Sequence, residues 1–96
     1  RDRDIVFNPK SEMSYLYLSK IFQNLDKKDL EEQNLNTVIL LNPKNEEAIY
    51  SLAKLKLKNS DFQKSRELNE RLGDLCIKFC EKSSKLKKEI ENLSKK

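Results

Sequence analysis

The sequence predicts an all-α protein of stacked helix–turn–helix units, and three observations carry this prediction. The triplet Asn-Pro-Lys at residues 8–10 returns at residues 42–44, and each copy precedes a stretch of helix-forming sequence. The chain of 96 residues has one Gly and two Pro, so it holds little loop-forming sequence. Alternating apolar runs are scarce, which disfavours strands. A period of 34 residues with a proline closing each unit is typical of helical repeats that stack into a solenoid.

The similarity between the two copies continues into the sequence that follows each triplet. Residues of the same or a similar kind stand one period apart at Glu12/Glu46, Tyr15/Ile49, Leu18/Leu52, Ser19/Ala53, Lys20/Lys54 and Ile21/Leu55. We therefore interpret residues 1–10 as the remnant of a preceding repeat, 11–44 as one repeat and 45–72 as a second. Residues 73–96 extend the last helix as a cap or a coiled coil. Because the chain begins with Arg, we expect the native N-terminus to be missing.

The first complete unit is expected to hold helices at 11–25 and 29–41, separated by a turn. Ser11 is a suitable N-cap, and Glu12 complements the positive end of the first helix. The second helix is expected to end before Pro43, because proline disfavours α geometry in the residue that precedes it.

The second unit is expected to begin with a helix at 45–58 capped by Asn45. Ser60 and Gln63 have the spacing of a capping box for the next helix. The two units together predict a core of Leu18, Ile21, Phe22, Leu35, Val38, Ile39, Ile49, Leu52, Ala53, Leu55, Phe62 and Leu68.

One long helix is expected at 61–94, because position 77, where a third proline is due, holds Ile. Apolar and small residues spaced four and three apart form a heptad stripe along it: Leu72, Cys76, Phe79, Ser83, Leu86, Ile90 and Leu93. A straight helix would need a second molecule to bury Phe79, Leu86, Ile90 and Leu93. The alternative is a turn at residues 73–74 that folds the stripe back onto the second unit; we favour the straight helix.

Cys76 and Cys80 lie four residues apart, on one face of this helix. The sequence has no His and no further Cys, so a zinc site lacks ligands and no metal is expected. We expect both thiols to be reduced and buried, as in a cytoplasmic protein. No apolar run approaches the roughly 20 residues of a membrane-spanning helix, so no membrane partner is expected.

The net charge of +4 at pH 7 is concentrated in the second half of the chain. Residues 49–96 hold 13 basic and 7 acidic residues, whereas residues 1–48 hold 7 and 9. This half is either a solvated basic face or a surface for an acidic partner. Nucleic acid is a weaker interpretation, because Lys alternates with Glu there and clustered Arg is lacking.

Catalysis is not predicted. The sequence lacks His, a Gly-rich phosphate loop, and a Ser or Cys beside a plausible base, so we assign no catalytic residue and no cofactor.

The apolar and small residues of both units resemble the tetratricopeptide repeat (TPR). The second unit supplies Ile49, Leu52, Ala53, Phe62 and Ser65, and the first supplies Tyr15, Leu18, Ser19, Phe22, Leu35 and Pro43. Lys56, Glu31 and Leu72 depart from the pattern. The resemblance implies the C-terminal fragment of a TPR-like array, an α-solenoid of antiparallel helix pairs followed by a long terminal helix. In such arrays the first helices line a concave groove. Here the groove would present Tyr17, Lys20 and Asn24 from one unit, and Tyr50, Lys54 and Lys58 from the other.

The function expected from these observations is a scaffold or protein-interaction module that binds a protein or an acidic peptide in this groove. The alternative is a structural role, in which the C-terminal helix forms a homo-oligomeric coiled coil. Helical nucleic-acid binding is a third and weaker interpretation.

Overall fold

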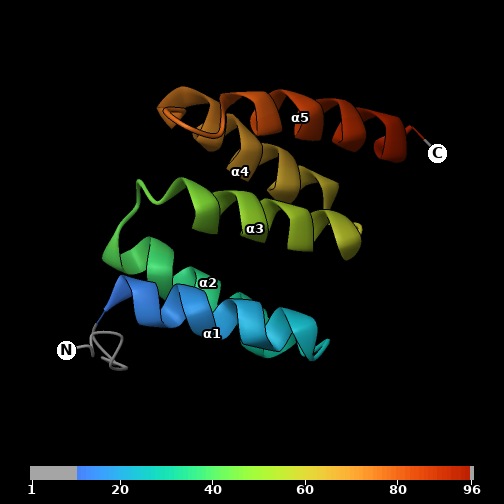
Figure 1. Ribbon diagram of the computed structural model, residues 1–96. Coiled ribbons are helices and arrows are strands. Elements are labelled where there is room, and N and C mark those ends of the chain that lie inside the picture. The colour runs from blue at the N-terminus through green and yellow to red at the C-terminus, as the bar shows by residue number, and fades with distance from the viewer. Residues whose placement is uncertain (1–10, 96) are drawn as a thin grey trace. The chain divides into compact units, whose positions relative to one another are not determined.

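The computed structural model describes residues 11–95, which form five α-helices and no strand (Figure 1). The helices are α1 (Glu12–Asn24), α2 (Lys28–Leu41), α3 (Glu46–Lys58), α4 (Phe62–Leu75) and α5 (Cys80–Ser94). The all-α prediction is confirmed, while the expected remnant at residues 1–10 lies outside the described part. The chain divides into two compact units, Arg1–Pro43 and Lys44–Lys96. The first holds the α1–α2 pair, and the second holds α3, α4 and α5.

The helix bounds recur with the 34-residue period of the sequence. α1 and α3 have 13 residues each and begin at Glu12 and Glu46. α2 and α4 have 14 residues each and end at Leu41 and Leu75. One period after Glu46, α5 begins at Cys80. The starts of α1, α3 and α5 are therefore one period apart.

The helix starts follow local chemistry, mostly as predicted. The Ser11 hydroxyl accepts a hydrogen bond from the Met13 N–H (3.2 Å), and the Asn45 side chain accepts one from the Ala48 N–H (2.9 Å). These caps satisfy amides that have no partner within the helix. The predicted capping box at Ser60 is wrong, because Asp61 caps α4 by accepting from the Lys64 N–H (3.2 Å).

The turns that follow α1 and α3 have the same geometry. Asp26 (φ 59°) and Ser60 (φ 64°) both adopt the left-handed conformation. The next N–H reaches back five residues in each turn, from Lys27 to the Phe22 carbonyl and from Asp61 to the Lys56 carbonyl, at 2.9 Å in both cases. This is a tight helix-ending arrangement that reverses the chain within a few residues.

Within the first unit, α1 and α2 pack as an antiparallel pair (Figure 1). Leu35 and Val38 are buried as predicted, whereas the expected core residues Leu18, Ile21, Phe22 and Ile39 are half-buried. Leu16 and Glu31 are buried instead, at 3% and 5% exposure.

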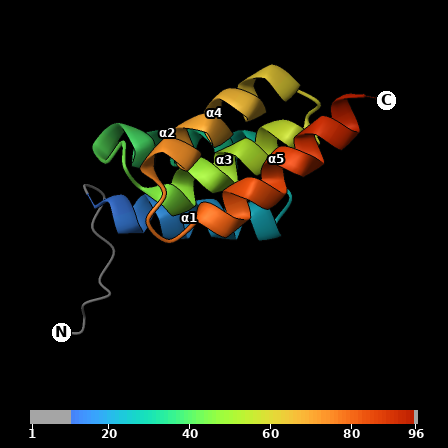
Figure 2. The same ribbon diagram turned by 90° about the horizontal axis from the view of Figure 1, so that it is seen from above.

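The second unit consists of three packed helices, in which α3 and α4 run antiparallel, as do α4 and α5 (Figures 1 and 2). Its buried apolar side chains come from all three helices: Ala48, Ile49, Leu52, Ala53, Leu55, Leu57, Leu68, Leu72, Leu86 and Ile90. The predicted core residue Phe62 is only half-buried. The Ser65 hydroxyl donates to the Ala53 carbonyl at 2.7 Å. This bond crosses between two helices, so a small residue at position 65 lets α3 and α4 approach closely.

The predicted single helix at 61–94 is wrong. The chain leaves α4 after Leu75 and reverses over residues 76–79, and α5 returns along α4 and also contacts α3 (Figure 1). The alternative turn at residues 73–74 is also displaced, because Gly73 lies inside α4. Leu86 and Ile90 are each 2% exposed within their own unit. Two of the four proposed oligomer residues are thus already covered, Phe79 is half-buried, and Leu93 is 38% exposed. Across residues 11–95, no helix is long and apolar enough to span a membrane.

Candidate interaction surface

A cluster of two aromatic rings and two lysines joins α3 to the start of α5. The rings of Tyr50 and Phe79 lie 5.6 Å apart between centroids, at an interplanar angle of 55°. The Lys82 ammonium lies 4.8 Å from the Phe79 centroid and 5.5 Å from that of Tyr50. The Lys54 ammonium lies 5.8 Å from the Tyr50 centroid. These distances are typical of tilted aromatic pairs and of cation–π contacts. We call these four residues the aromatic–lysine cluster.

The two lysines of the cluster differ in their acidic neighbours. The Lys54 ammonium pairs with the Glu89 carboxylate at 3.9 Å, with side chains 42% and 49% exposed. Such an exposed pair contributes little to stability, because both groups remain hydrated. Lys82 is exposed, and it forms no ion pair with another residue between 11 and 95. The cluster therefore carries an available positive charge beside two aromatic faces.

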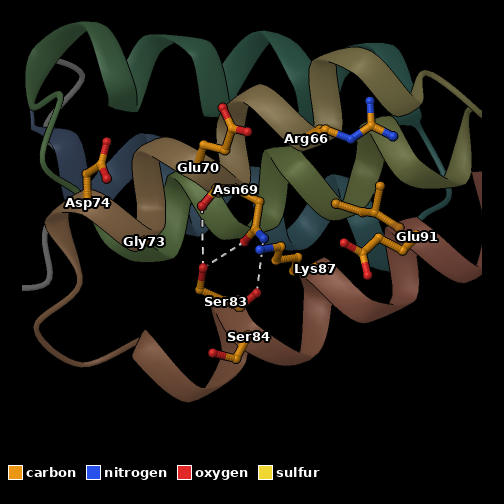
Figure 3. A pocket seen from close by; sticks show the side chains of 10 residues that line it. Arg66, Asn69, Glu70, Gly73, Asp74, Ser83, Ser84, Lys87 and Glu91 are labelled. Atoms are coloured by element: carbon orange, nitrogen blue, oxygen red, sulfur yellow. Dashed lines mark hydrogen bonds between the residues drawn. The ribbon is translucent and has the colours of Figure 1, made fainter.

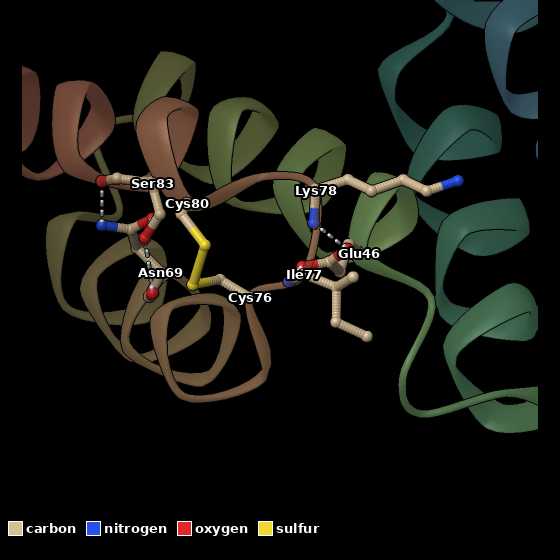
Figure 4. The surroundings of a disulfide bond; sticks show 7 residues. All are labelled: Glu46, Asn69, Cys76, Ile77, Lys78, Cys80 and Ser83. Carbon is tan, nitrogen blue, oxygen red and sulfur yellow. Dashed lines mark hydrogen bonds between the residues drawn. A yellow bond between two sulfur atoms is a disulfide. The ribbon is translucent and has the colours of Figure 1, made fainter.

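The loop that carries Phe79 is held by the first residue of α3. The Glu46 carboxylate accepts hydrogen bonds from the Ile77 N–H (2.5 Å) and the Lys78 N–H (3.0 Å) (Figure 4). Desolvation by burial acts to raise the pKa of this carboxyl. The backbone donors of Lys78, Ile77 and Phe79, with the Lys78 charge, outweigh that effect and lower the pKa. Glu46 is therefore held as a carboxylate that fixes the turn.

A disulfide between Cys76 and Cys80 closes the same loop, with the Cα atoms 5.0 Å apart (Figure 4). The prediction of two reduced, buried thiols is wrong, since Cys80 is exposed and Cys76 half-buried. The four-residue spacing of the cysteines predicted that both lie on one face of a continuous helix. The sulfur atoms meet because the chain reverses between α4 and α5, and this reversal depends on tertiary contacts. Phe79 is therefore positioned by the disulfide on one side and by Glu46 on the other.

The first unit has a related contact. The Glu12 carboxylate, at the first residue of α1, accepts a hydrogen bond from the Asn42 side-chain amide at 3.0 Å. Glu12 and Glu46 stand one period apart, and each binds the segment that follows the second helix of its unit. The 34-residue period pairs these two glutamates, and the sequence predicts only a helix-dipole role for Glu12. In the structure, each glutamate also joins the start of the first helix of its unit to the segment that follows the second helix.

The predicted groove residues fall into two sets. Tyr17, Lys20 and Asn24 are exposed on one face of α1, with Tyr17 at 65%. Tyr50 and Lys54 are half-buried in the aromatic–lysine cluster, and Lys58 is exposed at the last residue of α3. Sequence reasoning missed Lys82 and assigned Phe79 to an oligomer stripe. The available signal was the period itself, because Phe79 is one period beyond the N-cap Asn45.

A shallow cleft of about 270 Å³ runs between α4 and α5 (Figure 3). At its floor the Asn69 amide donates to the Ser83 carbonyl, and the Ser83 hydroxyl donates to the Asn69 side-chain oxygen, both at 3.0 Å. The surrounding charges are of both signs, from Arg66, Glu70, Asp74, Lys87 and Glu91. Because the buried polar groups of Asn69 and Ser83 are hydrogen-bonded to each other, we interpret the cleft as a contact between packed helices and not as a binding site.

Comparison of the sequence with protein-family models and with curated proteins finds no match. Within residues 11–95, no group of three or more His, Cys, Asp or Glu side chains is arranged to hold a metal ion. The surface chemistry of the two units therefore carries the functional inference.

Proposed function

We propose that this chain is a protein-interaction module of the tetratricopeptide type that binds an acidic peptide segment. The observation that carries the proposal is the aromatic–lysine cluster, in which an available ammonium group lies beside two aromatic rings. A peptide carboxylate placed there would form charge-assisted hydrogen bonds, and neighbouring apolar atoms would pack on the rings. Helix bounds that recur every 34 residues support the TPR assignment.

The exposed face of α1 is proposed as the contact of the first unit with the same class of partner. Tyr17 and Lys20 offer the same pair of side-chain types as Tyr50 and Lys54. Asn24 and Lys58 continue the two faces toward the helix ends. The binding groups would then be an aromatic ring and an ammonium group from each first helix.

A structural oligomer built on a straight C-terminal coiled coil has less support, because Leu86 and Ile90 are buried within their own unit. The disulfide bears on localisation. Disulfides persist in oxidising compartments and are rare in the cytosol of most organisms. We infer that the protein meets oxidising conditions, so the cytoplasmic assignment from the sequence loses its main support.

Binding of a fluorescein-labelled peptide rich in Glu and Leu, measured by anisotropy, tests the proposal. Lys82→Glu is expected to weaken binding about tenfold, equivalent to the loss of one charge-assisted hydrogen bond. Lys85→Glu is the matched control, because it makes the same charge change at an exposed position of the same helix. An equal loss in both variants would indicate non-specific charge attraction, and no binding by the wild type would reject the proposal.

A further inference from the structure

The segment between α4 and α5 has the sequence of a helix, although it forms a turn. Residues 76–79 read Cys-Ile-Lys-Phe and contain neither Gly nor Pro. The heptad pattern of residues 72–93 runs through them without a break. In the second repeat this segment occupies the place that Asn-Pro-Lys-Asn occupies at residues 42–45. The turn therefore depends on interactions with other parts of the fold.

Two interactions hold the turn: the Cys76–Cys80 disulfide and the Glu46 hydrogen bonds. Side chains four residues apart in an α-helix have their Cβ atoms about 5–6 Å apart. A disulfide needs Cβ atoms within about 3.5–4.5 Å. The closed disulfide is therefore incompatible with a regular helix through residues 76–80. Opening it removes the covalent part of the constraint.

The contacts that α5 makes are well suited to exchange between two copies. Leu86 and Ile90 are buried, and Ser83 bonds with Asn69 through its carbonyl and hydroxyl groups. If α5 of one copy occupied the place of α5 in another, the same contacts would form between chains. The straightened segment would gain helical hydrogen bonds in place of its two bonds to Glu46. Exchange of an identical element about a hinge is a low-cost route to a dimer.

We propose that the Cys76–Cys80 disulfide is a redox latch, and that its reduction allows two copies of this chain to exchange α5. The reductant is a dithiol. One of its thiolates attacks a cystine sulfur, the S–S bond breaks, and a mixed disulfide forms. The second thiolate of the reagent displaces the remaining cysteine. Cys76 and Cys80 end as thiols carrying two protons, and the dithiol becomes a disulfide. The proposal does not rest on the peptide-binding function, but straightening residues 76–79 would move Phe79 of the aromatic–lysine cluster.

Light scattering coupled to size exclusion, with and without dithiothreitol, measures the association of the 96-residue chain. The oxidised chain is expected to be monomeric from micromolar to millimolar concentration. The reduced chain is expected to be a dimer whose fraction rises with concentration. Cys76→Ser with Cys80→Ser should dimerise without reductant. Adding Ile77→Gly and Lys78→Gly should restore the monomer, because glycine disfavours the continuous helix.

Exchange of α5 is distinguished from side-by-side association by isotope-filtered NMR on a mixture of labelled and unlabelled reduced chains. The nuclear Overhauser effect between the Asn69 side-chain amide and Ser83 should then appear between chains. A dimer that shows this contact only within a chain would overturn the proposal. A reduced chain that stays monomeric, or that loses its far-ultraviolet helix signal, would overturn it as well. If the serine variants fail to fold, light scattering and NMR on the reduced wild-type chain are sufficient to test the proposal.

Discussion

Asn69 on α4 and Ser83 on α5 bind each other through their side chains and also through the Ser83 carbonyl, and both residues are buried (Figure 3). The Ser83 hydroxyl also lies 3.4 Å from the Asn69 carbonyl. The buried carbonyl and hydroxyl groups of Ser83 on α5 thus both have hydrogen-bond partners on α4. This fixes the position of α5 along α4, since a shift of one helical turn would separate the partners.

Asn69→Ala is expected to destabilise the second unit by about 1–3 kcal/mol, because it leaves buried polar groups of Ser83 without their partner. The free energy of unfolding from urea titration measures the effect. Asn92→Ala, at an exposed position of α5, serves as the control and should leave stability nearly unchanged. Similar losses in the two variants would contradict the pairing.

Gly73→Ala is expected to stabilise the protein by up to about 1 kcal/mol, since glycine inside a helix is less favourable than alanine by that amount. A Cβ at position 73 would lie 3.5 Å from the Ser83 hydroxyl, an ordinary contact distance. Thermal melting should show a rise in Tm of roughly 4–8 °C. A fall in Tm would mean that α4 and α5 pack too closely at position 73 to admit a methyl group.

Leu86→Ala is expected to cost about 2–5 kcal/mol, because it leaves a cavity where α5 packs on its own unit. Leu93→Ala makes the same chemical change at a position 38% exposed, and should cost about 1 kcal/mol or less. Urea titration of the oxidised chain compares them. Equal and small losses would show that α5 does not fold back.

Glu46→Gln is expected to lower the free energy of unfolding at neutral pH. It is also expected to make that free energy less dependent on pH in the acid range. The folded state lowers the pKa of Glu46 below its ordinary value of 4.5, so the unfolded chain binds more protons as acid is added. The contribution of Glu46 is fully present above that value and is lost as the pH falls through the lowered pKa. Urea midpoints measured between neutral pH and about pH 3 show the difference. Glu70→Gln, which removes a carboxylate at an exposed position of α4, is the control and should leave stability at neutral pH nearly unchanged.

Where an element depends on its own residues, the sequence predicted it well. Ser11 and Asn45 cap helices as expected, and α2 ends at Leu41, before Asn42 and Pro43. These features need only a side chain and the backbone within a few residues. The capping box at Ser60 failed for a local reason too, because Ser60 adopts the left-handed conformation of the turn after α3 and Asp61 caps α4 instead.

The end of α4 was missed because its causes are distant in the sequence. The glutamate that holds Ile77 is 31 residues upstream, and the disulfide forms only after the chain has reversed. The same error hid half of the candidate site. Phe79 and Lys82 reach Tyr50 only when α5 folds back, so a straight helix could not bring them together.

The two kinds of helix end imply an order of events during folding. Proline stops α2 in the nascent chain, before any tertiary structure exists. Before the disulfide has formed, the stop after α4 depends on Glu46, and therefore on a formed α3. The Ile77 and Lys78 amides should thus gain protection from hydrogen exchange later than the amides of α3. Until then residues 62–94 can form one continuous helix. We therefore expect α4 and α5 to become separate helices only after α3 has formed.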